Sequence, residues 1–192
     1  MNRRILAIAG FAAMALAGTT FAGLAPAQAG LFDFLESPFT TPAGTVAPPR
    51  ELVPFAGRQT PGTIIISLRE RRLYLVQPGG QALKYGVGVG RPGFTWSGVK
   101  QIAMKKEWPD WTPPPQMLRR RPDLPRHMKG GLDNPLGARA MYLGGTMFRI
   151  HGSNEPETIG QAVSSGCIRM TNADVSDLYD RVHVGTRVIV ER

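Results

Sequence analysis

Short apolar runs, separated by charged or glycine-containing turns, dominate the chain from residue 60 onward. β-Branched and aromatic residues are frequent in these runs, which is typical of strands rather than helices. The pattern predicts strands at residues 64–68, 73–76, 83–89, 99–105, 140–143, 147–150 and 187–190. We expect the first three to form an antiparallel meander, and Gly144-Gly145 to close a hairpin between the fifth and sixth.

One segment, TNADVSDLYDRV, has helical periodicity. Its apolar residues recur at i, i+3, i+4 and i+7, at Val175, Leu178, Tyr179 and Val182. Thr171 or Asn172 can cap its first turn. The sequence therefore predicts a mainly β domain with one principal helix, and residues 60–192 are numerous enough for a single core without internal repeats.

Residues 1–29 have the pattern of a secretory signal peptide. MNRR is a positively charged N-terminal region, and an apolar run follows it. APAQA favours cleavage after Ala29, with cleavage after Ala22 as the weaker alternative. Gly10 and Gly18 interrupt the apolar run and no stop-transfer charges follow it, which favours a cleaved signal over a retained membrane helix. We expect a periplasmic protein with no transmembrane segment after signal cleavage.

Residues 30–59 are rich in proline, glycine and threonine, which predicts a linker or a loosely ordered arm before the domain at 60–192. The chain carries a net charge of +9, and removal of Arg3 and Arg4 with the signal leaves +7. Such a field attracts anionic partners, which outside the cytoplasm are cell-wall polymers or lipid headgroups. No nucleic-acid-binding signature accompanies the charge, so we expect no nucleic acid partner.

The segment between residues 107 and 137 is long and irregular, with three consecutive prolines at 113–115. Long loops in compact domains are usually functional or disordered, and Trp108 and Trp111 favour an ordered loop. Arg119, Arg120 and Arg121 lie within it. Two interpretations stay open for them: a solvated charged face, or contact with an anionic substrate as a lid.

Cys167 is the only cysteine, so no intramolecular disulfide can form. A lone cysteine is either a small buried hydrophobe or a reactive thiol. Ser164, Ser165 and Gly166 precede it, and the predicted helix begins shortly afterwards; a helix N-terminus favours a thiolate and small neighbours allow backbone amides to face a substrate carbonyl. His151 directly follows the strand predicted at 147–150 and is the candidate base.

Metal and nucleotide chemistry have no comparable support in the sequence. There is no second cysteine or HExxH motif, and His127 and His183 lack clustered carboxylates. GVGVGRPG resembles a dinucleotide loop, but a proline and the absence of a following helix contradict that reading. We expect neither a metal nor an organic cofactor.

The stretch HGSNEPETIGQAVSSGCIRM closely resembles the active-site signature of the L,D-transpeptidase catalytic domain family, the YkuD type, in which HG is followed by S-x-GC-[IV]-R. Flanking stretches such as YGVGVGRPGFTWSG and GGLDNPLGARAMYLG are similar to its periplasmic branch, and the resemblance covers residues 60–192. One position departs from the pattern: many members have histidine where this chain has Ser165.

The resemblance implies mixed β-sheets forming a sandwich with a helix, and a cysteine acyl transfer on peptidoglycan stem peptides of the meso-diaminopimelate type. Cys167 would attack the carbonyl that precedes the terminal D-Ala and release it, and a second stem amine would attack the thioester to give a 3→3 cross-link in cell-wall synthesis and shape. Water, or the amine of an outer-membrane lipoprotein or protein, is the alternative acceptor. An inactive wall-binding module is the third hypothesis.

Roles within the site follow from the same resemblance. His151 would be the base, Gly152 or Ser153 would orient its ring, and the amides of Gly166 and Cys167 would form the oxyanion hole. Arg169 would bind a substrate carboxylate or, alternatively, pair with Asp174 or Asp177. The remaining predicted substrate-contact positions are Ser164, Ser165, Asn134 and Tyr142.

Overall fold

The predicted meander is present in the computed structural model, which describes residues 47–192. Strands β2 (Ile64–Ser67), β3 (Arg72–Gln77) and β4 (Gln81–Gly86) pair antiparallel in sequence order. Ile64, Ile66 and Leu73 are fully buried, because alternating apolar residues of these strands face one core. The predicted signal peptide and the first part of the predicted arm lie outside the described residues.

The last part of the predicted arm forms a strand. β1 (Glu51–Pro54) pairs antiparallel with β4 at the edge of the sheet, and the amide of Phe55 donates to the carbonyl of Gly80. The structure therefore differs from the expectation of a linker over residues 51–54. Because most of its side chains are exposed, β1 is held by main-chain pairing and lacks the apolar alternation that would have revealed it.

A nine-stranded mixed sheet contains most of the remaining strands, in the order β1-β4-β3-β2-β11-β6-β7-β8-β10. Its further members are β6 (Gly98–Glu107), β7 (Arg139–Leu143), β8 (Arg149–His151), β10 (Ile168–Arg169) and β11 (Arg187–Glu191). β11 is parallel to β2 and antiparallel to β6, and β10 is parallel to β8. β5 (Val89–Gly90) and β9 (Ala162–Ser164) form a separate parallel pair.

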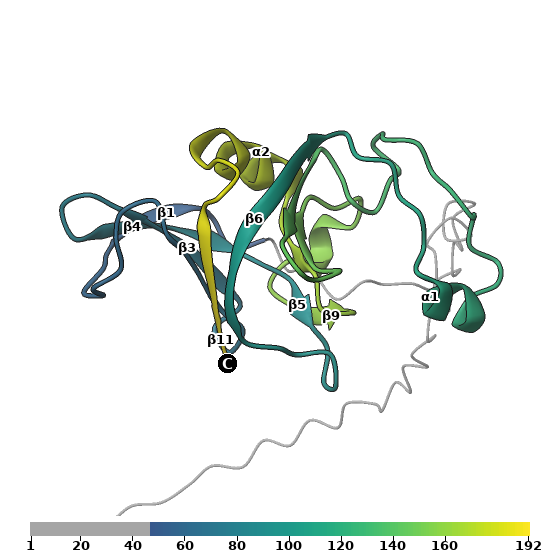
Figure 1. The fold of residues 1–192 in the computed structure, drawn as a ribbon, viewed down its shortest axis with the longest axis horizontal. Helices are drawn as coiled ribbons and strands as arrows, with labels where there is room; N and C mark the ends of the chain where they lie inside the picture. Colours follow the sequence, from purple (N-terminus) through teal and green to yellow (C-terminus); the bar gives the residue numbers. More distant parts are fainter. Residues whose placement is uncertain (1–46) are drawn as a thin grey trace, which may run out of the picture. The chain divides into compact units, whose positions relative to one another are not determined.

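The long strand β6 joins the two halves of this sheet (Figure 1). Its first part pairs with β11 and its second with β7, with a register irregularity between Ile102 and Met104 where the partner changes. The predicted mainly β fold class is confirmed, with the refinement that the two halves are continuous through β6. The curled sheet encloses a core that includes Tyr85, Met141 and Ile150.

The predicted helix is α2 (Asn172–Arg181), with Thr171 as its N-cap: the Thr171 hydroxyl accepts the amide of Asp174 at 3.1 Å. Val175 and Leu178 are buried in the core beside β7. The structure adds a six-residue helix, α1 (Pro115–Arg120), and a 3-10 turn at Pro156–Thr158. None of the helices within residues 47–192 has the length and hydrophobicity of a membrane span.

Lys105 of β6 fastens the end of α2 to the sheet. Its ammonium donates to the carbonyls of Tyr179 and Val182, both at 2.6 Å, and lies 4.0 Å from the centre of the Tyr179 ring. The last carbonyls of a helix lack partners within the helix and carry partial negative charge. A cation from the neighbouring strand therefore satisfies them, which fixes the helix that follows Cys167.

Replacing Lys105 by methionine is expected to lower the free energy of unfolding by about 1.5–3 kcal/mol, because two charge-assisted hydrogen bonds are lost while the length of the side chain is kept. Urea denaturation monitored by circular dichroism measures the change. Lys106→Met, at the exposed neighbouring position, is the control and should have an effect within about 0.5 kcal/mol. Equal effects of the two substitutions would contradict the role given to Lys105.

Candidate active site

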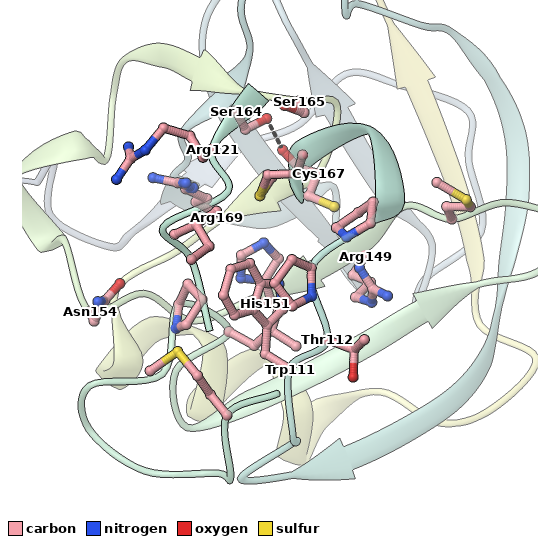
Figure 2. Close-up of a pocket in the computed structure, with 18 of the residues that line it drawn as sticks. Trp111, Thr112, Arg121, Arg149, His151, Asn154, Ser164, Ser165, Cys167 and Arg169 are labelled. Carbon is pink, nitrogen blue, oxygen red and sulfur yellow. Dashed lines mark hydrogen bonds between the residues drawn. The ribbon is translucent and has the colours of Figure 1, made fainter. Parts of the chain in front are cut away.

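A pocket of about 940 Å³ contains both Cys167 and His151 (Figure 2). One wall comes from β8, β9, β10 and the turn between β9 and β10, and another from the loop between β6 and β7. The strand side contributes Arg149, His151, Ser164, Ser165, Cys167 and Arg169, and the loop side contributes Trp111, Thr112, Pro113, Met117, Arg120, Arg121 and Met128, among others.

The parallel register of β8 and β10 brings the two candidate catalytic residues together. Ile168 pairs with Ile150, and Arg169 pairs with His151. Successive side chains of a strand point to opposite faces, so both isoleucines, fully buried, face the core. His151 and Arg169 face the pocket instead. Cys167 lies two residues before Arg169 and therefore emerges on the same face as His151.

His151 is buried and is held in one tautomer. Its Nδ1 lies 2.6 Å from the carbonyl oxygen of Gly152, which can only accept, so Nδ1 carries the proton and Nε2 is left as an acceptor. Burial lowers the pKa of His151 to about 3, and the nearby charges of Arg169 and Arg149 act in the same direction. The ring is therefore neutral at neutral pH, as a base must be before it takes a proton.

The turn that carries Cys167 is fixed by the hydroxyl of Ser164. That hydroxyl donates to the carbonyl of Cys167 at 2.6 Å and accepts the amide of Gly166 at 3.1 Å. Of the two amides predicted to form an oxyanion hole, the amide of Gly166 is thus already bonded. The amide of Cys167 has no hydrogen-bond acceptor within residues 47–192.

Two glycines of the predicted signature are required by close contacts. Gly166 has φ +110°, and a Cβ there would lie 2.5 Å from the ring of Phe148. A Cβ on Gly152 would lie 2.2 Å from the side-chain oxygen of Asn172. That oxygen accepts the amides of Ala138 and Ser153, at 2.9 and 3.3 Å. Asn172, considered above only as a helix cap, thereby fixes the backbone beside Gly152, the residue that orients His151.

Arg169 forms an ion pair, but not with the predicted partners. Its guanidinium lies 2.8 Å from a carboxylate oxygen of Glu155. Asp174 and Asp177 pair with Arg50 instead, and Asp177 also accepts from Arg181 and from the hydroxyl of Tyr85. Both aspartates are bound by other cations and Arg169 pairs with Glu155, so the proposed pairing of Arg169 with Asp174 or Asp177 is wrong.

Arg91 and Arg149 also line the pocket, and neither forms an ion pair with a carboxylate of the described residues. The Arg91 guanidinium lies 4.1 Å from the centre of the Phe94 ring and donates to the hydroxyl of Ser165 at 3.2 Å. Sequence reasoning missed both arginines, because each stands alone in an apolar or glycine-rich context. Only the contact with Ser165 reveals the relation of Arg91 to the site.

Asn134 and Tyr142 do not line the pocket. Asn134 is buried; its side-chain nitrogen donates to the carbonyls of Pro109, Met128 and Lys129, and its oxygen accepts the amide of Leu136. It therefore braces the loop that forms one pocket wall. Tyr142 pairs across the hairpin with Arg149, whose guanidinium lies 5.2 Å from the centre of the tyrosine ring.

The loop between β6 and β7 forms one wall of the pocket, and of its two tryptophans Trp111 is buried whereas Trp108 is exposed. Trp111 is buried and exchanges backbone hydrogen bonds with Met128, both at 2.8 Å. Arg120 and Arg121 line the pocket, and Arg121 also pairs with Asp123 at 2.6 Å. Residues 47–192 bring together no group of three or more histidine, cysteine, aspartate or glutamate side chains that could hold a metal ion.

Comparison with solved structures shows that this curled β domain has a known fold. An L,D-transpeptidase from Mycobacterium smegmatis matches with a TM-score of 0.54 at 20% identity, over 68% of this chain and 58% of that one. A Brucella melitensis protein described as a probable carnitine operon oxidoreductase matches with a TM-score of 0.50 at 46% identity, over 74% of this chain and 93% of that one.

The model of the L,D-transpeptidase catalytic domain, YkuD, matches residues 61–190, so the chain belongs to this family, a class of acyltransferases. A curated relative, the probable L,D-transpeptidase ErfK/SrfK of Escherichia coli, is 39% identical over 134 residues, 65% of this chain and 42% of that protein. The chain spans about half or less of the length of the first curated relatives it matches.

The buried neutral His151 predicts a specific pH dependence of stability. Unfolded histidine binds a proton near pH 6.5, whereas folded His151 does so only near pH 3, so stability falls as pH falls through that window and is unaffected above it. Between pH 7 and pH 5 the parent should lose about 2 kcal/mol more than the variant His151→Gln. Urea denaturation at both pH values measures this; equal losses would contradict it.

Proposed function

We propose that the chain is an L,D-transpeptidase that forms 3→3 peptidoglycan cross-links with Cys167 as its nucleophile. The observation that carries this proposal is the register of β8 and β10, which presents Cys167 and a neutral, oriented His151 on one face of a single pocket. Family membership supports the choice of reaction. A cleavable signal at residues 1–29 would deliver the enzyme to the periplasm, where its polymeric substrate lies.

The first half-reaction begins with a neutral imidazole, because burial keeps the His151 pKa low. As the Cys167 sulfur attacks the carbonyl of the L-centre of meso-diaminopimelate, its proton passes to Nε2 of His151. The tetrahedral oxyanion collapses, the carbon–nitrogen bond breaks, and the same proton leaves with D-Ala.

The second half-reaction transfers the acyl group. The side-chain amine of a second stem peptide attacks the thioester while His151 accepts a proton from it. The new amide forms, the carbon–sulfur bond breaks, and that proton returns to the Cys167 sulfur. No external energy source is required, since the thioester conserves the activation of the original amide.

The charge of the pocket supports an acidic peptide as the substrate. Arg91, Arg120, Arg121, Arg149 and Arg169 line it, against two carboxylates, Asp133 and Glu155. Stem peptides carry free carboxylates, and arginine binds a carboxylate through paired hydrogen bonds. Arg91, Arg120 and Arg149 have no carboxylate partner in the described part of the chain and are therefore the side chains best placed to bind the substrate.

The first test is turnover of disaccharide-tetrapeptide, followed by mass spectrometry. The parent should give cross-linked dimers and free D-Ala, and Cys167→Ala should give neither while keeping the parental circular dichroism and melting temperature. A tripeptide product without dimer would indicate water as the acceptor. Dimer formation by Cys167→Ala would contradict the mechanism, and a folded parent that binds the wall without converting it would indicate a binding module.

The second test concerns Arg91. Arg91→Gln should raise the KM for tetrapeptide about tenfold, the effect of one lost charge-assisted contact, and leave kcat within about twofold, because Arg91 contacts substrate rather than the reacting bond. Arg187→Gln, at an exposed position of β11 away from the pocket lining, is the matched control and should change neither constant. A parental KM in Arg91→Gln would remove Arg91 from the substrate site.

A further inference from the structure

Trp96 lies in the segment between β5 and β6 and contacts the turn that carries Cys167. Its indole nitrogen donates a hydrogen bond to the carbonyl oxygen of Gly166 at 2.8 Å. Its ring stacks on Phe148, with the ring centroids 4.7 Å apart and the planes 7° from parallel. Trp96 itself is not among the residues that line the pocket.

The contact fixes the peptide group between Gly166 and Cys167. No cis peptide bond occurs in residues 47–192, and in a planar trans peptide the carbonyl oxygen and the following N–H point in opposite directions. Holding the Gly166 oxygen against Trp96 therefore directs the Cys167 N–H away from Trp96. That amide is also the one without an acceptor among the described residues, whereas the Gly166 amide is bonded to Ser164.

Two further contacts hold this orientation. The Phe148 ring lies where a side chain at residue 166 would be, so only glycine allows Trp96, Phe148 and the turn to pack together. On the other side, Ser164 holds the carbonyl of Cys167. A side chain thus binds the carbonyl of each peptide group next to the nucleophile: Ser164 binds the group after Cys167, and Trp96 binds the group before it. The orientation of the peptide group that contains the unbonded Cys167 amide is therefore determined by the Trp96 indole.

We infer that Trp96 is a positioning residue that preorganises the Cys167 amide as an oxyanion-hole donor through its hydrogen bond to Gly166. The inference rests on the proposed acyl transfer by Cys167 and adds to it a residue more than 70 positions away in the sequence. Donors fixed before reaction stabilise the developing oxyanion without reorganisation. When the Gly166 carbonyl is released, its peptide group can rotate and the Cys167 amide is no longer held in place.

The test is Trp96→Phe, which keeps an aromatic ring to stack on Phe148 and removes only the N–H donor. Acylation of Cys167 by a carboxylate-bearing amide or lactam substrate should slow by about 10–100-fold in the maximal rate constant, somewhat less than the loss of a direct oxyanion donor, with KM within about twofold. Alkylation of Cys167 by iodoacetamide passes through no oxyanion and should keep its rate and its pH profile. Trp108→Phe, the same change at an exposed tryptophan, is the matched control and should leave all rates unchanged.

The outcomes separate this inference from the proposed function. If the parent is alkylated but never acylated, the acyl-transfer proposal fails and the role of Trp96 fails with it. If the parent is acylated and Trp96→Phe is acylated at the parental rate, only the role of Trp96 is overturned. Equal losses of acylation and alkylation, or a lower melting temperature with a raised KM, would identify Trp96 as structural support and would also overturn the inference.

Discussion

The parallel pairing of β8 with β10 is the constraint on which the site depends. It comprises two residue pairs, Ile150 with Ile168 and His151 with Arg169. The isoleucines are fully buried, so their burial specifies the register: a slip of one residue would move an isoleucine into the pocket and His151 into the core. Packing of the two isoleucines in the core therefore also fixes the relative positions of His151 and Cys167. The loops around the pocket add its other wall.

The positive charge of the pocket has two consequences that support each other. Arg149 and Arg169 lower the pKa of His151, which together with burial keeps the imidazole neutral and able to accept a proton. The same guanidinium groups favour negative charge nearby, whether on a substrate carboxylate or on the oxyanion that forms during attack. Glu155 offsets part of this field by pairing with Arg169, whereas Arg91, Arg120 and Arg149 line the pocket without a carboxylate partner among residues 47–192.

The meander and the β7–β8 hairpin were predicted because short runs rich in apolar, β-branched and aromatic residues are separated by turn residues, and α2 because its apolar residues recur with a helical period. The signature from His151 to Arg169 contains Cys167 and His151, which one pocket brings together. β1, β9 and β10 were missed because these short strands lack such a run. The roles of Asn134 and Asn172 could not be predicted for a different reason. Each side chain forms hydrogen bonds with backbone groups distant in the sequence, and no local pattern distinguishes this role from helix capping or substrate contact.

Ser165, where the chain departs from the expected signature, is contacted by the segment between β5 and β6. Arg91 donates to Ser165 and Trp96 donates to Gly166, so one segment contacts two successive residues ahead of the nucleophile. A serine at 165 is short enough to leave the Arg91 guanidinium at the pocket wall and polar enough to hold it there. A histidine would fill part of that space and, when protonated, would repel the arginine. Ser165 is therefore best understood together with Arg91, as a pair that places a cation beside the turn that carries Cys167.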